Sequence, residues 1–137
     1  MIDGMSAVNI IKHKFHETSD PVLIPLLRDG FFTAKLKDGG IAVDNLSTQP
    51  FLTWNVFIET INLLNRKGGR AVRGNAMDYR LGDTGLPLDS IEGHIAHVVY
   101  GKQIGDIIFR RISPIASILI WAGICESAPG ELILRQA

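Results

Sequence analysis

Residues 111–134, RISPIASILIWAGICESAPGELIL, carry the strongest secondary-structure pattern in the chain. Ser113 followed by Pro114 is typical of a helix start, because serine caps free backbone amides and proline tolerates the first helical position. The apolar positions that then recur at helical spacing are Ile115, Ile118, Leu119, Ala122 and Cys125. Residues 128–130, APG, predict a tight turn, and residues 131–135 predict a terminal strand.

The residues before this stretch predict two more helices. Between residues 51 and 65 apolar side chains recur at helical spacing, and Gly68-Gly69 ends that helix. Residues 70–86 are rich in glycine and predict a loop. Asp89 and Glu92 have the spacing of a capping box, in which Asp89 caps a helix that runs to Tyr100. From residue 51 the predicted order is therefore helix, loop, helix, helix and strand.

Three helices followed by a β segment is the order of a winged helix-turn-helix domain. Residues 122–127, AGICES, resemble the turn that leads from the recognition helix of such domains into the wing strand. Residues 51–136 as a whole resemble the N-terminal DNA-binding domain of Mrr-type restriction endonucleases, with residues 57–69 as the matching first helix and glycine turn. The resemblance implies a winged-helix protein that binds duplex DNA, as a transcriptional regulator or a targeting module without catalytic activity.

The first fifty residues predict a smaller unit. Ser19-Asp20-Pro21 is a helix start signal, and we expect a short helix over residues 22–27; residues 1–19 fit either a short helix or a strand. Residues 31–37 alternate apolar and polar side chains, and residues 41–43 return after a turn at Asp38-Gly39-Gly40, which predicts a β-hairpin. The predicted fold class is α+β, with a helix and hairpin in residues 1–50 and a winged-helix-like body in residues 51–137.

The winged-helix interpretation selects the residues that would contact DNA. Two arginines precede the last helix, two serines are its polar members, and further basic residues follow the earlier helices. The predicted DNA-binding residues are Arg110, Arg111, Ser113, Ser117, Lys102, Arg73 and Arg70. A solvated basic surface is the simpler alternative, and Arg111 could instead pair with Asp106 or Glu126. Residues 51–137 hold 9 Lys/Arg against 8 Asp/Glu, a small margin for phosphate neutralisation.

The last helix departs from a typical recognition helix, because apolar residues dominate it and base readout needs polar side chains. It could be buried, or it could form a contact with another protein. The alternative function is therefore a protein-interaction or dimerisation module. In that case Ile120 and Trp121 belong to an apolar surface that binds another protein or a second copy of the chain, as a homodimer.

Composition excludes several other classes. The chain has 137 residues with 14 Lys/Arg and 14 Asp/Glu, which is unlike a histone-like or acidic-tail protein. We expect a cytoplasmic protein that does not span a membrane, since the longest apolar run is about 14 residues and a span needs about 20. The single cysteine fits a reducing compartment.

Catalytic and metal chemistry find little support in the sequence. The histidines fall in two pairs at i, i+3 spacing, His13 with His16 and His94 with His97, but two ligands do not make a metal site. Nothing marks a base beside Cys125, and no nucleotide-binding glycine motif follows a strand. We therefore predict no catalytic residues, no metal and no cofactor.

Overall fold

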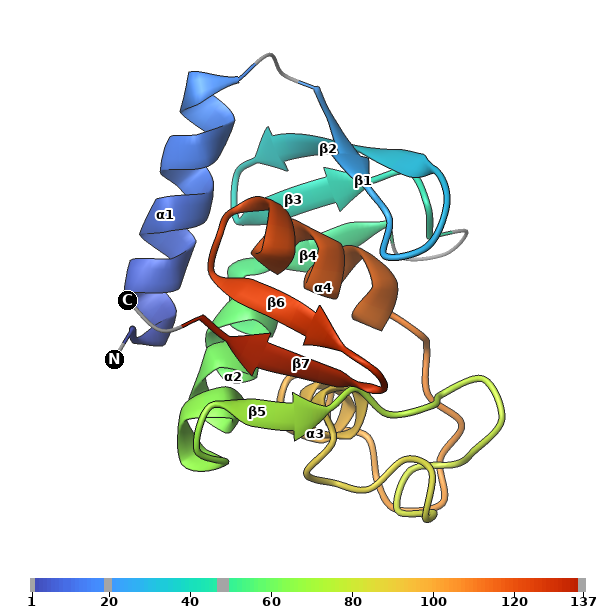
Figure 1. Ribbon diagram of the computed structural model, residues 1–137. Coiled ribbons are helices and arrows are strands. Elements are labelled where there is room, and N and C mark those ends of the chain that lie inside the picture. Colours follow the sequence, from blue (N-terminus) through green and yellow to red (C-terminus); the bar gives the residue numbers. More distant parts are fainter. Residues whose placement is uncertain (1, 19–20, 47–49, 136–137) are drawn as a thin grey trace.

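A computed structural model describes residues 2–18, 21–46 and 50–135 of the chain. Over these residues the chain forms four helices and two antiparallel sheets, which confirms the α+β class (Figure 1). The helices are α1 (Gly4–Glu17), α2 (Trp54–Arg66), α3 (Ile91–Val98) and α4 (Ile112–Trp121). The first sheet has the strand order β1 (Val22–Pro25), β2 (Phe31–Lys37), β3 (Gly40–Val43) and β4 (Phe51–Thr53). The second has the order β5 (Arg70–Val72), β7 (Glu131–Leu134) and β6 (Cys125–Ala128).

The segment after residue 21 differs from the prediction, because strand β1 stands where a helix was expected over residues 22–27. Val22 and Ile24 are buried while Leu23 is exposed, which is the two-residue alternation of a half-buried strand. In so short a segment helical and strand spacing differ little, and the antiparallel pairing with β2 decides the outcome. The helix start signal at residues 19–20 lies outside the described residues.

Helix α1 occupies the segment that the sequence left open between helix and strand. Asp3 caps it, since its carboxylate accepts a hydrogen bond from Ser6 N at 2.8 Å. Ala7, Ile11 and Phe15 are buried on its inner face, and α1 packs along α2. The helix of the first fifty residues is therefore α1, and it lies before the residues 22–27 where a helix was expected.

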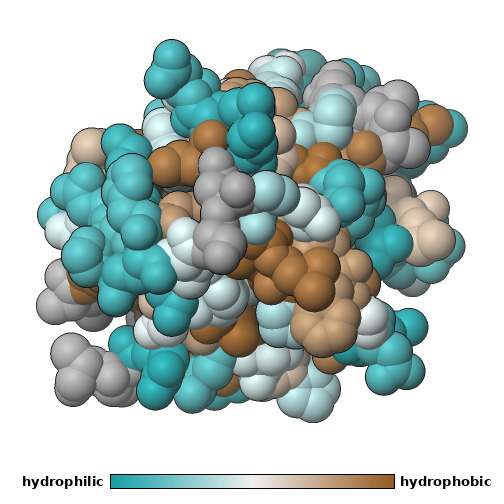
Figure 2. Space-filling view, turned by 90° about the horizontal axis from the view of Figure 1, so that it is seen from above, coloured by the Kyte–Doolittle hydropathy of each residue, from teal (hydrophilic) through white to brown (hydrophobic). Residues whose placement is uncertain are grey.

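The β2–β3 hairpin forms as the alternating sequence predicts. Lys37 pairs with Gly40 across the turn, and Gly39 has a φ of 81°, a conformation that favours glycine. The hairpin is extended on both sides, by β1 and β4, into a four-stranded sheet. Figure 2 shows apolar atoms near the middle of the upper face of the molecule, and Leu23 and Phe31 of this sheet are both more than half exposed.

Helix α3 begins differently from the predicted capping box. Ser90 is its N-cap, with the hydroxyl accepting a hydrogen bond from Gly93 N at 3.1 Å. Asp89 forms an ion pair with Lys67 at 2.6 Å. Glu92 turns away from its own helix and accepts a hydrogen bond from Arg111 N at 2.6 Å, at the start of α4. The acidic residue of the expected box therefore caps a helix distant in sequence.

Helix α4 begins at Ile112, two residues before Pro114, which was predicted as the first helical position, and its N-cap is Arg111 instead of the predicted Ser113. The helix is buried along most of its length. The first sheet and α1 cover it, because β1 packs on α4 and the Phe15 ring meets the Trp121 ring edge-on at 5.0 Å. The larger hydrophobic core contains buried residues from α1, both sheets and helices α2 to α4. The predicted boundary at residue 50 therefore falls inside a sheet and inside one core.

Two long loops, residues 73–90 and 99–111, lie beside α3 at the lower right of Figure 1. They enclose a second, small core of Leu81, Leu86, Ala96 and Ile108. Among the described residues, no helix is both long enough and apolar enough to cross a membrane.

Candidate functional site

A groove of about 1360 Å³ opens between four segments that are distant in sequence. One wall is the turn between β1 and β2, and the opposite wall is the chain that follows β5. The turn between β6 and β7 closes one end, and the start of α4 lies between the walls. These segments meet on the right-hand side of Figure 1, where the N-terminal sheet approaches the β6–β7 hairpin.

Three arginines from three of these segments line the groove: Arg28, Arg73 and Arg110. Among the described residues none of the three has a carboxylate within ion-pair distance. Arg110 Nη1 lies 3.3 Å from the thioether sulfur of Met77, which is a weak contact. Asp29 and Asp78 also line the groove, so its positive charge is partly offset. The arginines are therefore free to bind an anionic partner.

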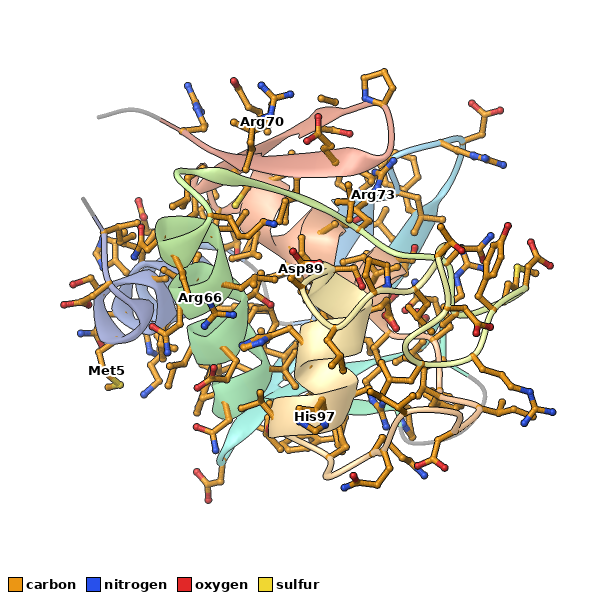
Figure 3. All side chains as sticks on the ribbon, turned by 90° about the horizontal axis from the view of Figure 1, so that it is seen from below. Met5, Arg66, Arg70, Arg73, Asp89 and His97 are labelled. Atoms are coloured by element: carbon orange, nitrogen blue, oxygen red, sulfur yellow. The ribbon has the colours of Figure 1, made fainter. Side chains whose placement is uncertain are left out.

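Of the predicted DNA-binding residues, the structure brings Arg73, Arg110 and Ser113 together in this groove. Arg70 is not part of the groove lining and forms a bidentate ion pair with Glu131 at 2.7 and 3.3 Å. The carboxylate of Glu131 raises the pKa of Arg70, and Arg70 lowers the pKa of Glu131. Figure 3 shows Arg70 and Arg73 well separated on the lower face, and Lys102 is exposed outside the groove.

Two other predicted contacts, Arg111 and Ser117, are buried, with 4% and 2% of their surface exposed. The Arg111 guanidinium stacks 3.7 Å from the centre of the Tyr100 ring, and its Nη1 donates to Phe109 O at 3.2 Å. Ser117 lies in the middle of α4 and faces the core. Neither side chain can reach a DNA backbone, so both assignments are corrected to structural roles.

The burial of α4 also contradicts the prediction that this helix enters a DNA groove. From Pro114 to Leu119 every residue of the helix is buried, and Ile120 and Trp121 are only partly exposed. The helix therefore presents no face that could enter a DNA groove. It also presents no large apolar surface for a second protein, because residues of α1 and β1 already cover it.

Glu92 lies beneath the groove with 2% of its surface exposed. Its carboxylate accepts a hydrogen bond from Arg111 N at 2.6 Å, and its own backbone N donates to Arg73 O at 3.0 Å. Burial raises the pKa of Glu92 to about 7, and the amide and charge of Arg111 oppose the shift. Glu92 therefore connects the backbones of two arginine-bearing segments.

The histidine pairs do not form metal sites. His94 is buried and its Nε2 lies 2.9 Å from Glu59 Oε1, while His97 Nδ1 donates to Lys102 O at 2.8 Å. His13 lies beside Glu17 on the exposed face of α1. Over the described residues no cluster of three or more His, Cys, Asp or Glu side chains could hold a metal ion.

Cys125 is buried, and burial raises the pKa of its thiol to about 12. The thiolate, which is the reactive form, is therefore absent at neutral pH. Among the described residues, this cysteine has no hydrogen-bonded base of the kind a nucleophile needs.

Sequence reasoning missed Arg28 and Glu92. Arg28 lies in a segment interpreted as the end of a helix, although the adjacent Asp29-Gly30, with Gly30 at a φ of 98°, is the signature of a turn. Glu92 was assigned to its own helix because its partner lies 19 positions further along the chain. Comparison of the chain with protein-family models, curated proteins and solved structures gave no match.

Proposed function

We propose that the chain is a winged-helix protein, not an enzyme, and that it binds duplex DNA through the arginine-lined groove rather than through α4. The element order supports the fold: α2, β5, α3, α4 and the β6–β7 hairpin follow one another as the helices and wing of such a domain do. The second sheet has the order β5-β7-β6, so the hairpin pairs with the strand that follows the first helix.

The observation that carries the proposal is the convergence of Arg28, Arg73 and Arg110 without carboxylate partners among the described residues. Guanidinium groups bind phosphate with two parallel hydrogen bonds, and such contacts hold a protein on the duplex. In a winged-helix domain the β6–β7 turn, which lines the groove, would correspond to the wing. Because α4 is buried, we expect contacts to phosphates and little direct reading of bases.

Binding to a fluorescent duplex of about 20 base pairs, followed by anisotropy over a series of salt concentrations, tests the proposal. Three phosphate contacts predict that log K falls against log salt with a slope of about −3. Replacing Arg28, Arg73 and Arg110 together by alanine should lower affinity at low salt at least ~10-fold and flatten the slope.

The matched control removes three exposed cations outside the groove, by the changes Lys35→Ala, Lys37→Ala and Lys102→Ala. This variant loses the same net charge as the groove variant. Because its three cations lie outside the groove, it should nevertheless keep most of the affinity. Equal losses in both triple variants would show a diffuse charge effect and would contradict a site at the groove.

A second candidate, a protein-interaction or dimerisation module, is favoured by the apolar part of the groove lining. Leu27, Val72 and Met77 line it with 40%, 44% and 73% of their surfaces exposed. Exposed apolar side chains grouped in a hollow are typical of protein contacts. Light scattering after gel filtration would show a dimer that Leu27→Ser with Met77→Ser dissociates, whereas a DNA-binding monomer would keep its mass.

A further inference from the structure

Glu92 is a buried carboxyl-bearing residue that contacts the backbone of two segments of the groove. Its carboxylate accepts a hydrogen bond from Arg111 N at 2.6 Å, while its backbone N donates to Arg73 O at 3.0 Å. Arg73 N in turn donates to Gly130 O at 2.9 Å, in the turn between β6 and β7. Glu92 is thus bonded to the segment after β5 and to the start of α4, and Arg73 joins the first of these to the hairpin turn, so three of the four boundaries of the groove are connected.

We propose that Glu92 is a positioning residue for the groove, and that a proton on its carboxylate strengthens the binding of an anionic partner there. This inference rests on the proposed function for the identity of the partner, duplex DNA. A carboxyl oxygen of Glu92, which can accept a hydrogen bond in either protonation state, sets the position of Arg111 N and, through the adjacent residue, of Arg110. The carboxyl group of Glu92 therefore positions the segment that carries Arg110, while the backbone of the same residue holds the segment that carries Arg73.

The sign of the effect follows from electrostatics. The positive charges of Arg110 and Arg111 favour the ionised form of Glu92, so they already interact with its carboxylate. A phosphate bound to Arg110 adds a negative charge near the carboxylate, which disfavours its ionisation. By linkage, binding takes up a proton, and affinity should rise as the pH falls through the pKa of about 7.

The other charged groups near α3 have different partners. Glu59 and Arg66 of α2 face His94, at 2.9 and 3.5 Å from its two ring nitrogens. Lys67, at the end of α2, pairs with Asp89. Arg110 and Arg111 are the charged side chains that act on Glu92 among the described residues. Glu92 is thus the carboxyl group through which pH acts on the groove, and His94 is the nearby group to control for.

The first measurement uses the free, full-length protein. The backbone amide signals of Arg73, Arg110 and Arg111 are followed by NMR between pH 5 and pH 8, in the wild type and in Glu92→Gln. We expect a shared titration step near pH 7 that disappears in Glu92→Gln and persists in His94→Gln. A merely structural carboxylate would leave Arg73 and Arg110 without this step, and that result would overturn the proposal.

The second measurement is duplex affinity at pH 6 and pH 8, at constant salt. Wild-type affinity should be about three- to tenfold higher at pH 6, Glu92→Gln should be nearly flat at the higher value, and His94→Gln should keep the wild-type ratio. An unchanged pH ratio in Glu92→Gln would overturn the linkage. Absence of duplex binding at both pH values, with the NMR step present, would overturn the proposed function while supporting the positioning role of Glu92.

Discussion

At the scale of single residues, the most informative feature is the burial of two charged side chains, Glu92 and Arg111. The Glu92 carboxylate accepts a hydrogen bond from the Arg111 backbone amide, and the Arg111 guanidinium stacks on Tyr100. Arg111 thereby covers an aromatic ring with its planar face, which a lysine could not do as well. Buried ionisable groups of this kind make stability depend on pH.

We predict that Glu92→Gln removes a pH dependence of stability. The pKa of Glu92 in the folded chain, about 7, lies above its ordinary value of 4.5. Protonated Glu92 therefore contributes stability that is fully present below the unfolded pKa and is lost as the pH rises through 7. The difference amounts to about 3 kcal/mol in the free energy of unfolding.

Urea unfolding at pH 5 and pH 8 measures this effect. The wild type should lose stability relative to Glu92→Gln over that interval, so that the variant is the more stable protein at pH 8. Curves that stay parallel between the two proteins would contradict a raised pKa at this residue.

The sequence predicted the candidate site residues only in part, because side-chain burial depends on distant partners. Arg73 and Arg110 were found from their positions next to glycines and helix ends, and both line the groove. Arg111 is the next residue after Arg110, and the sequence alone does not distinguish the two. The contact of the Arg111 guanidinium with the Tyr100 ring shows that Arg111 points inward. Arg28 was missed because its turn approaches the groove through the packing of β1 on α4, which no local pattern reports.

At the scale of elements, local signals succeeded where a turn or a periodic run is self-contained. The β2–β3 hairpin, α2 and the final strand β7 were all predicted from spacing and glycines. The strand β1 was not, since Val22 to Pro25 acquires its conformation from the neighbouring β2. Residues 51–53, which form strand β4, were predicted to be part of the following helix, because no break in apolar character separates them from α2.

Gly40 is the element-scale site where a methyl group should be most damaging to the first sheet. A Cβ at Gly40 would lie 2.1 Å from Leu52 O, in the backbone of the adjacent strand β4. Gly40→Ala should therefore separate β3 from β4 and lower the free energy of unfolding by roughly 2 kcal/mol or more, measured by urea unfolding.

The neighbouring turn residue provides the control. Gly39 has a positive φ of 81° and no atom within 4 Å of a built Cβ. Asparagine tolerates this conformation, so Gly39→Asn should cost less than about 1 kcal/mol. A larger loss at Gly39 than at Gly40 would contradict the close approach of β3 and β4.

At the scale of the whole molecule, the chain has one principal core that crosses the predicted boundary at residue 50. Ile11 and Ile24 from the first segment belong to the same buried cluster as Ile61 and Ile118 from the second. The predicted boundary near residue 50 thus separates two parts of the chain that share one core.

We predict that residues 51–137 do not fold cooperatively when produced alone. Without α1 and strands β1 to β3, the apolar sides of α2 and α4 lose the residues that cover them. The fragment should bind a hydrophobic dye and lack the near-ultraviolet circular dichroism signal of Trp121 in the full chain. A fragment with that signal and a sharp thermal transition would contradict a shared core.

The packing of β1 on α4 also determines when the protein can fold in the cell. Synthesis delivers β1 well before α4, so the contact between the first sheet and α4 cannot form until the later helix has been made. Closing this contact requires a loop that spans most of the chain, which slows folding. The nascent polypeptide therefore cannot complete its core until α4 has left the ribosome.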